Sequence, residues 1–260
     1  RSAQVFTLGI QTIGKAHQVK SGTYYFAKPE SLERIIERVT NSIYGLPTKS
    51  ITLYEGEPNF EYAKRLADAF EFVDEQEFLR LAKDKEGYLF PDTYTISLRA
   101  DTAEVIAQLE SNFNSRIAPL KDEIAASPYT LEQIITMASL VETEAGNASY
   151  KDKQRVAGVL WKRYNKGMLL QADAVFSYIF KQHLPRVLLK HLEVDSPYNI
   201  YKNTGLPPGP IANPGLDAIR ATLNPIIDNS LYYLTGTNGI FYYASNLAAH
   251  ERNRRNYIVY

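Results

Sequence analysis

Residues 128–147 read Pro-Tyr-Thr-Leu-Glu-Gln-Ile-Ile-Thr-Met-Ala-Ser-Leu-Val-Glu-Thr-Glu-Ala-Gly-Asn, and they carry the start and stop signals of one helix. Thr130 and Gln133 have the spacing of an N-terminal capping box. Gly146 and Asn147 predict a left-handed stop. Between these ends, apolar residues recur at the spacing of one helix face: Leu131, Ile134, Ile135, Ala138, Val141 and Ala145. The stretch therefore predicts a helix that turns one face to the core.

Glu142 lies on the centre line of that apolar face, between Ala138 and Ala145. A charged carboxylate there is costly unless it is paired or protonated, and burial raises the pKa of a carboxyl group. A protonated glutamic acid is what a glycosidic oxygen needs from a general acid. Pairing with an arginine or lysine would instead make Glu142 purely structural, and the periodicity fits both interpretations. Glu144 is expected about 200° further round the helix, facing water or a neighbouring loop.

The composition excludes several classes of site. The 260 residues include 29 basic and 29 acidic side chains, so the charge gives no indication of a nucleic-acid partner. Cysteine is absent, which excludes disulfides and thiolate chemistry. The four histidines lack the spacing of a zinc motif, and neither a metal nor another cofactor is expected. No apolar run approaches the roughly 18 residues of a membrane span. Because the chain opens at Arg1 without a signal-peptide pattern, we expect a trimmed or mature fragment.

The first 54 residues are expected to form a small separate module. Residues 5–10 and 23–26 alternate like short strands, and Ser31 opens a helix that reaches Val39. Residues 50–54 have the pattern of a further strand. The sum is a compact strand–helix–strand module, typical of a binding or spacer domain. An N-terminal extension of the main sheet fits the same pattern.

Residues 55–260 are expected to form a second, mainly helical domain. Helix signals occur at residues 60–72, 74–81, 101–113, 152–166, 174–180 and 213–223. Asp173 is expected to cap the helix at 174–180, and Asn213 to cap the one that ends at Leu223. Two strand patterns, 231–235 and 240–244, flank Gly-Thr-Asn-Gly, which predicts a β-hairpin with a primed turn. The fold class is therefore α+β.

Five motifs occur in a fixed order along the chain. They are Glu-Gly-Tyr-Leu-Phe-Pro-Asp-Thr-Tyr at 86–94, Ala-Ser-Leu-Val-Glu-Thr-Glu at 138–144, Leu-Gln-Ala-Asp at 170–173, Ser-Pro-Tyr-Asn-Ile-Tyr at 196–201 and Gly-Leu-Pro-Pro-Gly-Pro-Ile-Ala-Asn-Pro-Gly at 205–215. Together they resemble, in this order, the signatures of the MltG (YceG-like) endolytic murein transglycosylases. The resemblance extends from Gly22 to the closing segment at residues 246–250.

This resemblance implies a LysM-like module followed by a transglycosylase catalytic domain. It also implies a single-pass anchor preceding Arg1, which would hold the catalytic domain on the extracytoplasmic side of a bacterial plasma membrane. The implied reaction cleaves the MurNAc–GlcNAc bond inside nascent peptidoglycan strands and leaves 1,6-anhydroMurNAc ends, which terminates strand elongation. The implied partners are peptidoglycan glycan strands and the peptidoglycan synthases. By the motif match, the catalytic glutamate is Glu142.

Nine further side chains are candidates for substrate binding: Glu86, Asp92, Tyr94, Gln171, Asp173, Tyr198, Asn199, Asn246 and His250. The tyrosines offer stacking faces and the amides suit an N-acetyl group. Structural roles remain open for most of them, because the motif at 86–94 also fits an aromatic turn that stabilises the fold. Residues 171 and 173 fit a helix cap, and residues 246 and 250 fit a hydrogen-bonded pair on one helix face.

One carboxyl group suffices for the lytic reaction, because the C6 hydroxyl of the sugar replaces water as the nucleophile. A conventional hydrolytic muramidase needs a second carboxylate, for which Glu86 and Glu144 are candidates. A non-catalytic peptidoglycan-binding module is a further alternative. The three functions differ in their products, since hydrolysis adds water, the lytic reaction does not, and a binding module releases nothing.

Overall fold

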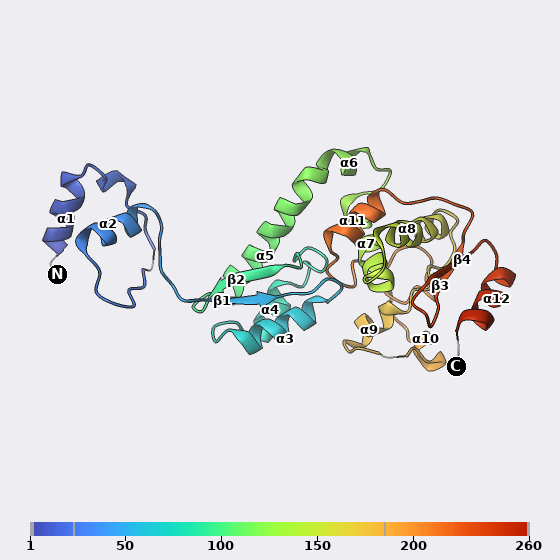
Figure 1. The fold of residues 1–260 in the computed structure, drawn as a ribbon. Coiled ribbons are helices and arrows are strands. Elements are labelled where there is room, and N and C mark those ends of the chain that lie inside the picture. The colour runs from blue at the N-terminus through green and yellow to red at the C-terminus, as the bar shows by residue number, and fades with distance from the viewer. Residues whose placement is uncertain (1–2, 23, 185, 259–260) are drawn as a thin grey trace.

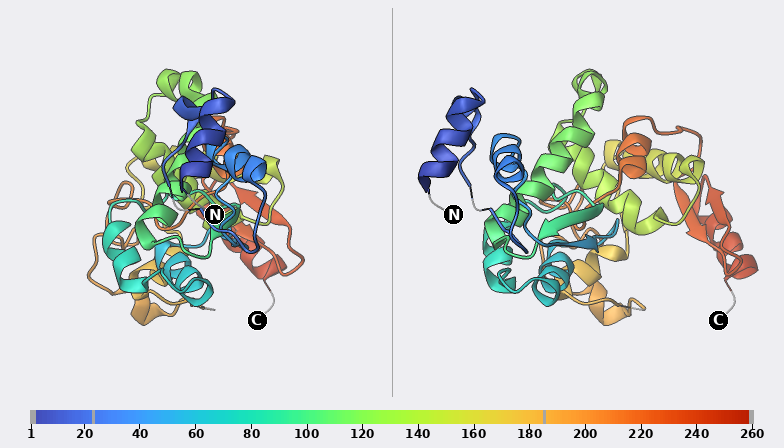
Figure 2. Two further views of the ribbon diagram at one scale, coloured as in Figure 1. Left: turned by 90° about the vertical axis from the view of Figure 1, so that its left-hand side faces the viewer. Right: turned by 60° about the vertical axis from the view of Figure 1, so that its left-hand side comes forward.

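The structure is a computed structural model that describes residues 3–22, 24–184 and 186–258. It is mainly helical with two small antiparallel sheets, which confirms the α+β class. Two short helices stand apart at the N-terminal end, and an extended segment joins them to the larger body (Figure 1). The right-hand view of Figure 2 shows the same separation. Among the described residues, no helix combines the length and the apolar character that crossing a membrane requires.

The N-terminal end contains helices where two strands were predicted. Residues 5–10 lie within α1 (Ala3–Thr12), and a 3-10 turn follows at η1 (Ala16–Gln18). Residues 24–26 are irregular, while residue 23 lies outside the described residues. The strand prediction failed because an apolar run of six residues fits either period, and here Phe6 and Ile10 pack on the next helix. That helix is α2 (Leu32–Thr40), capped by Ser31 as predicted.

The first sheet joins a strand of the predicted N-terminal module to a later part of the chain. β1 (Thr48–Thr52) pairs antiparallel with β2 (Thr93–Ser97). A core of buried residues lies between this sheet and three helices, α3 (Asn59–Ala69), α4 (Glu75–Leu81) and α5 (Thr102–Ile117). The described residues before residue 54 therefore do not form a strand–helix–strand module. The division of the chain after residue 54 stays a prediction.

The central helix forms as predicted at its start but ends differently. After η2 (Ala118–Leu120) and α6 (Lys121–Ala126), α7 (Leu131–Ala145) opens with the capping box of Thr130 and Gln133. The left-handed stop is wrong, because Gly146 has φ −53° and stays in the right-handed region. α8 (Tyr150–Asn165) and α11 (Leu216–Leu223) pack on α7, and residues 134–142 are all buried. α7 is thus a core helix and does not expose a polar face along its middle.

The C-terminal part supplies the other side of the body. It contains α9 (Ala174–Phe180), α10 (Leu189–Leu192), β3 (Tyr232–Thr235), β4 (Phe241–Ala244) and α12 (Leu247–Tyr257). β3 and β4 form the predicted antiparallel hairpin. Its connection is a three-residue loop, closed by a hydrogen bond from the Gly236 N–H to the Ile240 carbonyl, with Gly239 at φ +75°. The two-residue primed turn is therefore wrong.

Candidate active site

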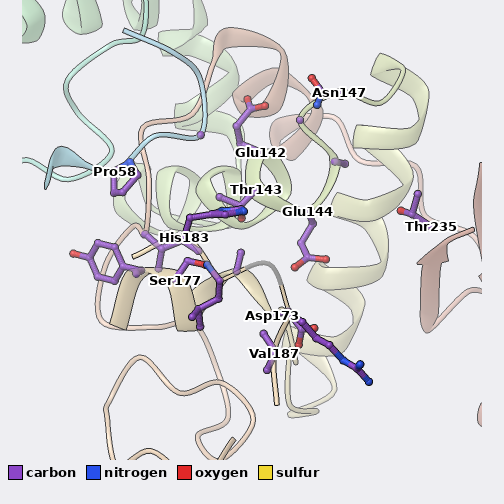
Figure 3. Close-up of a pocket in the computed structure, with 18 of the residues that line it drawn as sticks. Pro58, Glu142, Thr143, Glu144, Asn147, Asp173, Ser177, His183, Val187 and Thr235 are labelled. Atoms are coloured by element: carbon purple, nitrogen blue, oxygen red, sulfur yellow. The ribbon is translucent and has the colours of Figure 1, made fainter. Parts of the chain in front are cut away.

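A cleft of about 1600 Å³ opens beside the C-terminal turn of α7. Its walls come from four segments that are far apart in the sequence: residues 55–61, residues 142–148, the α9–α10 region and the hairpin with α12. Figure 3 shows Glu142, Thr143 and Glu144 at the end of α7 on one side, with Asp173, Ser177 and Val187 nearby. The cleft is therefore lined by the end of the motif at residues 138–144.

Glu142 combines the two roles that the sequence left open. Its side chain is almost fully buried, with the residue 3% exposed, yet it lines the cleft. Lys153 of α8 lies with its Nζ 3.1 Å from Glu142 Oε1, and the Gly215 N–H donates to Oε2 at 3.0 Å. Burial raises the pKa of Glu142, Lys153 and Gly215 oppose that rise, Glu55 adds to it, and the net pKa is raised. Glu142 is therefore a lysine-paired carboxyl group held in the wall of a cleft, with an increased tendency to keep its proton.

Gly146 is required by the position of Glu142. A Cβ atom at residue 146 would lie 2.7 Å from the Glu142 carbonyl oxygen and 3.0 Å from its Oε1. Glycine removes that conflict and lets the carboxyl group fold back over the end of the helix. The glycine that looked like a left-handed stop in the sequence instead makes room for Glu142.

Of the two surroundings expected for Glu144, open water or a neighbouring loop, the structure shows a neighbouring segment. Glu144 leaves α7 in the opposite direction from Glu142 and points toward Asp173 (Figure 3). Tyr233 Oη donates to Glu144 Oε2 at 3.1 Å, and the backbone N–H groups of Asp173 and Ala174 also bond to this carboxyl group. Burial, partly offset by these bonds, raises the pKa of Glu144 to about 7. A second carboxyl group with a perturbed pKa thus lines the same cleft.

Asp173 lines the cleft, but its predicted capping role is wrong. Its side chain makes no capping hydrogen bond to α9. The carboxyl group instead accepts a hydrogen bond from Tyr201 Oη, and both residues line the cleft. The start of α9 is capped by Glu144, which reaches it from α7. Substrate binding by Asp173 stays a prediction.

Two predicted binding residues of the motif at 86–94, Asp92 and Tyr94, make hydrogen bonds within the fold and are not among the described residues that line the cleft. Asp92 accepts from Arg116 at 2.6 Å and Asn112 at 3.1 Å, and Asn112 also donates to Tyr94 Oη at 2.9 Å. Burial raises the pKa of Asp92, but these bonds outweigh it and the net pKa is lowered. Tyr94 is buried, and its hydroxyl donates to a main-chain carbonyl. Among the described residues, neither side chain lines the cleft.

Glu86 lies behind the cleft wall. It is half-buried, and its carboxyl group accepts from the Asn59 N–H at 2.9 Å. Burial raises its pKa to about 8, against the smaller effect of that hydrogen bond. Its charge acts on Tyr178, which does line the cleft. Glu86 is therefore close to the cleft without being among the described residues that line it.

Three further candidates have structural partners. Gln171 accepts from Arg163 at 2.7 Å and has a backbone φ of +55°. Tyr198 packs against Tyr178 with the ring centroids 5.0 Å apart. Asn199 is fully buried, and its amide donates to the carbonyls of residues 192 and 194. Among the described residues these three side chains are absent from the cleft lining, and their role in binding stays a prediction.

Asn246 and His250 do not form the expected side-chain pair among the described contacts. The Asn246 side chain caps α12 by accepting from the Ala249 N–H at 2.9 Å. The His250 ring stacks on Tyr232 with the centroids 5.2 Å apart, and burial lowers the pKa of His250. Both side chains thus organise the hairpin and the closing helix.

Asn213 is a structural residue whose role the sequence misassigned. The cap of α11 is Gly215, not Asn213. The Asn213 Oδ1 accepts from the Gly87 and Leu89 N–H groups at 3.0 and 3.2 Å, while its amide donates to Asn59. This one buried side chain ties the proline-rich loop to the turn at residues 86–94. Lys153, Gly215 and Glu55 were also missed, because a contact between distant segments has no local sequence signal.

An α+β fold with a buried glutamic acid of raised pKa in the wall of a large cleft is suited to an enzyme that cleaves glycan chains. The chain belongs to the YceG-like family, whose family model matches residues 1–256. It is 33% identical to the endolytic murein transglycosylase of Bacillus subtilis (strain 168) in an alignment of 267 positions that covers 92% of this chain and 73% of that relative. The family resemblance is thereby confirmed.

Two further similarities agree. The endolytic murein transglycosylase of Streptococcus pneumoniae serotype 2 (strain D39 / NCTC 7466) is 36% identical over 174 residues, or 65% of this chain and 31% of that relative. The 2.6 Å crystal structure of the putative yceG-like protein lmo1499 from Listeria monocytogenes superposes with a TM-score of 0.73 at 27% identity. That superposition covers 97% of this chain and 90% of the Listeria chain. The fold is therefore shared along almost the whole length.

Proposed function

We propose that this chain is an endolytic peptidoglycan lytic transglycosylase, with Glu142 as its acid and base. The observation that carries the proposal is the Glu142 carboxyl group, buried between Lys153 and the Gly215 N–H yet lining a large cleft. The relatives from Bacillus subtilis and Streptococcus pneumoniae, both described as endolytic murein transglycosylases, support it.

The proposed reaction needs one proton carrier. Protonated Glu142 donates its proton to the glycosidic oxygen, the bond from the MurNAc C1 to that oxygen breaks, and the electron pair stays on the leaving oxygen. The C6 hydroxyl oxygen of the same MurNAc then bonds to C1 and closes the 1,6-anhydro ring. Its proton returns to the Glu142 carboxylate. No water is consumed, and Glu142 ends in its starting form.

The local environment suits both halves of this cycle. Burial raises the pKa of Glu142, which favours the protonated form needed first. Lys153, 3.1 Å from Oε1, stabilises the carboxylate that exists after the proton has left. Burial and Lys153 thus act on the pKa of Glu142 in opposite directions, and the net pKa is raised.

The size of the cleft supports cleavage within a strand. Sites for small ligands commonly have volumes of about 300–1000 Å³. The cleft has about 1600 Å³ and is bounded by four separate segments, so it has room for several consecutive sugars. An extended chain of sugars on both sides of the scissile bond is what endolytic cleavage requires.

A hydrolytic muramidase is the second candidate, because Glu144 lines the same cleft and burial raises its pKa to about 7. In that reaction one carboxyl group protonates the leaving oxygen and the other activates water or attacks C1. Glu144 is held by Tyr233 and by the start of α9, on the side of α7 away from Glu142. That divergence favours the lytic reaction, which needs only Glu142.

The proposal extends to the cellular setting implied by the family resemblance. We expect an anchor in the bacterial plasma membrane with the catalytic region on the extracytoplasmic side. The substrate would then be nascent strands beside the peptidoglycan synthases. The division into residues 1–54 and 55–260 is part of the same proposal.

Mass spectrometry of digested peptidoglycan tests the reaction class. The purified protein is incubated with sacculi or with nascent glycan strands, and the released muropeptides are compared with an untreated sample. We expect products that end in 1,6-anhydroMurNAc and are one water lighter than reducing ends. Reducing ends would instead support the muramidase, and strand binding without release would support a binding module.

A further inference from the structure

The Glu55 carboxyl group lies near Glu142 and has no bonding partner among the described residues. Glu55 follows β1, is exposed, and lines the cleft. Among the described residues it has no ion-pair or hydrogen-bond partner, whereas the nearby Glu57 is paired with Arg65. Its charge nevertheless acts on Glu142 and raises the pKa of that group. An unpaired carboxylate beside a buried carboxyl group costs folding free energy, and such an arrangement is typical of functional sites.

Gly215 lies beside both carboxyl groups. Its N–H donates to Glu142 Oε2 at 3.0 Å, and a Cβ atom at this residue would overlap the Glu55 carboxyl group. The two carboxyl groups therefore flank one glycine. From standard bond lengths they lie no more than about 8 Å apart. Separations of about 5 to 9.5 Å are typical of the two carboxyl groups that flank a scissile glycosidic bond.

The two groups also have opposite environments. Glu142 is 3% exposed and paired with Lys153, whereas Glu55 is exposed at the cleft surface. Such a difference in environment suits a division of acid and charge-stabilising roles between two carboxyl groups of one site. The charged groups acting on Glu142 are Lys153 of α8 and Glu55, and Gly215, the N-cap residue of α11, contributes its N–H.

We propose that Glu55 is a second catalytic carboxylate, which faces the anomeric carbon and stabilises its positive charge while Glu142 transfers the proton. This inference rests on the proposed function. Glu55 forms no covalent bond and exchanges no proton. As the C1–O bond breaks, the positive charge shared by C1 and the ring oxygen lies opposite the Glu55 carboxylate. It disappears when the C6 oxygen bonds to C1, and the proton of that hydroxyl goes to Glu142.

The primary test is Glu55→Gln, assayed on defined glycan strands with separate kcat and KM values. We expect kcat to fall about 100-fold, the usual range for losing a group that stabilises transition-state charge, with KM within about twofold. Because Glu55 raises the pKa of Glu142, the alkaline limb of the pH profile should move to lower pH. Glu55→Asp should recover part of the rate. Glu71→Gln is the matched control, because Glu71 is exposed, is not among the described residues that line the cleft, and its substitution removes the same charge.

A second variant displaces the carboxylate without removing it. Gly215→Ala introduces a Cβ atom where the end of the Glu55 side chain lies, while the backbone φ of −75° suits alanine. We expect a loss of kcat in the parent and little further loss in the Glu55→Gln background, as a double-mutant cycle requires of two changes that act through one group. Thermal denaturation checks that every variant is folded.

The outcomes separate the inference from the function on which it rests. If Glu142→Gln is inactive and Glu55→Gln keeps kcat within threefold of Glu71→Gln, the role of Glu55 is wrong and the proposed function stands. A rise in KM alone would also overturn it, because it would make Glu55 a binding group. If Glu142→Gln keeps its activity while Glu55→Gln loses it, the assignment of Glu142 fails instead.

Discussion

The two sides of the last turn of α7 show how differently one helix can use neighbouring glutamic acids. On one side Glu142 contacts a lysine and a backbone N–H, and on the other Glu144 contacts a tyrosine hydroxyl and the start of α9. Burial raises the pKa of both groups. Only Glu142 has a cation within ion-pair distance among the described residues. The partners of the two carboxyl groups, more than their burial, therefore distinguish Glu142, the proposed proton carrier, from Glu144, which joins α7 to the start of α9 and to Tyr233.

The largest effect on stability is expected on the Glu142 side, for Lys153→Met. The substitution keeps an apolar stem but leaves Glu142 as a buried carboxyl group without its cation. We expect the free energy of unfolding to fall by about 3 kcal/mol at pH 8. The pKa of Glu142 should rise further, since Lys153 lowers it in the parent. Because a raised pKa costs stability as pH rises, the deficit should be smaller at pH 5.

Denaturant unfolding at both pH values measures this deficit. Lys151→Met is the control, because Lys151 is exposed on the same helix. An equal loss of unfolding free energy at pH 5 and pH 8 would mean that the loss comes from packing. The ion pair between Lys153 and Glu142 would then not explain it.

A smaller effect on activity is expected on the other side, for Glu144→Gln. The amide keeps one acceptor oxygen for Tyr233 or the start of α9. We expect kcat to fall less than about tenfold, with products that still end in the anhydro sugar. The pKa of Glu144, about 7 in the folded protein, lies above its ordinary value, so the parent loses stability as pH rises from about 4.5 to 7. The variant should therefore gain in melting temperature relative to the parent between pH 5 and pH 8.

Kinetics of Glu144→Gln measure the expected small loss of kcat, and thermal denaturation measures the expected gain in melting temperature. A loss of activity as large as that of a general acid would make Glu144 the proton donor. The distinction between the two sides of α7 would then be reversed, and the hydrolytic muramidase would become the favoured function.

The smallest effect is expected for Glu86, which extends the comparison to a carboxyl group behind the cleft wall. Burial raises its pKa to about 8, so the parent loses stability as pH rises from about 4.5 to 8. Glu86→Gln keeps an acceptor for the Asn59 N–H and removes the titration. We expect the melting temperature of the variant to exceed that of the parent by a few degrees at pH 8 and to be similar at pH 5. An increase that is the same at both pH values would exclude Glu86 titration as its cause.

Local signals predicted the helices of this fold well. Helices were predicted to begin at residues 31, 74, 101 and 130, and the side chain at each of these positions accepts from the N–H three residues on, a contact that local spacing contains. The hairpin at residues 231–244 was predictable because its two strands are neighbours in the sequence and a short glycine-containing segment joins them. The strand predicted at residues 5–10 failed because its conformation depends on Ile36 and Val39, which the local pattern does not contain.

The sequence predicted only the part of the candidate site that lies on one helix, α7. The periodicity placed Glu142 on a buried face, and the structure agrees. It could not indicate that Lys153, Gly215 and Glu55 converge there, since these residues come from three other segments. For Glu144 it allowed either open water or a neighbouring loop, because the angle around a helix says which way a side chain points but not what packs there. Asn213 shows the same limit, since its contacts lie more than a hundred residues away along the chain.

The account depends on Glu142 as the group that carries the proton, and kinetics of Glu142→Gln on glycan strands measures this most directly. The amide has nearly the same shape and can still accept from the Gly215 N–H, but it cannot donate a proton and take one back. We predict a folded protein whose kcat for anhydro product is lower by about a thousandfold. A folded variant that releases 1,6-anhydroMurNAc ends within tenfold of the parent rate would contradict the account.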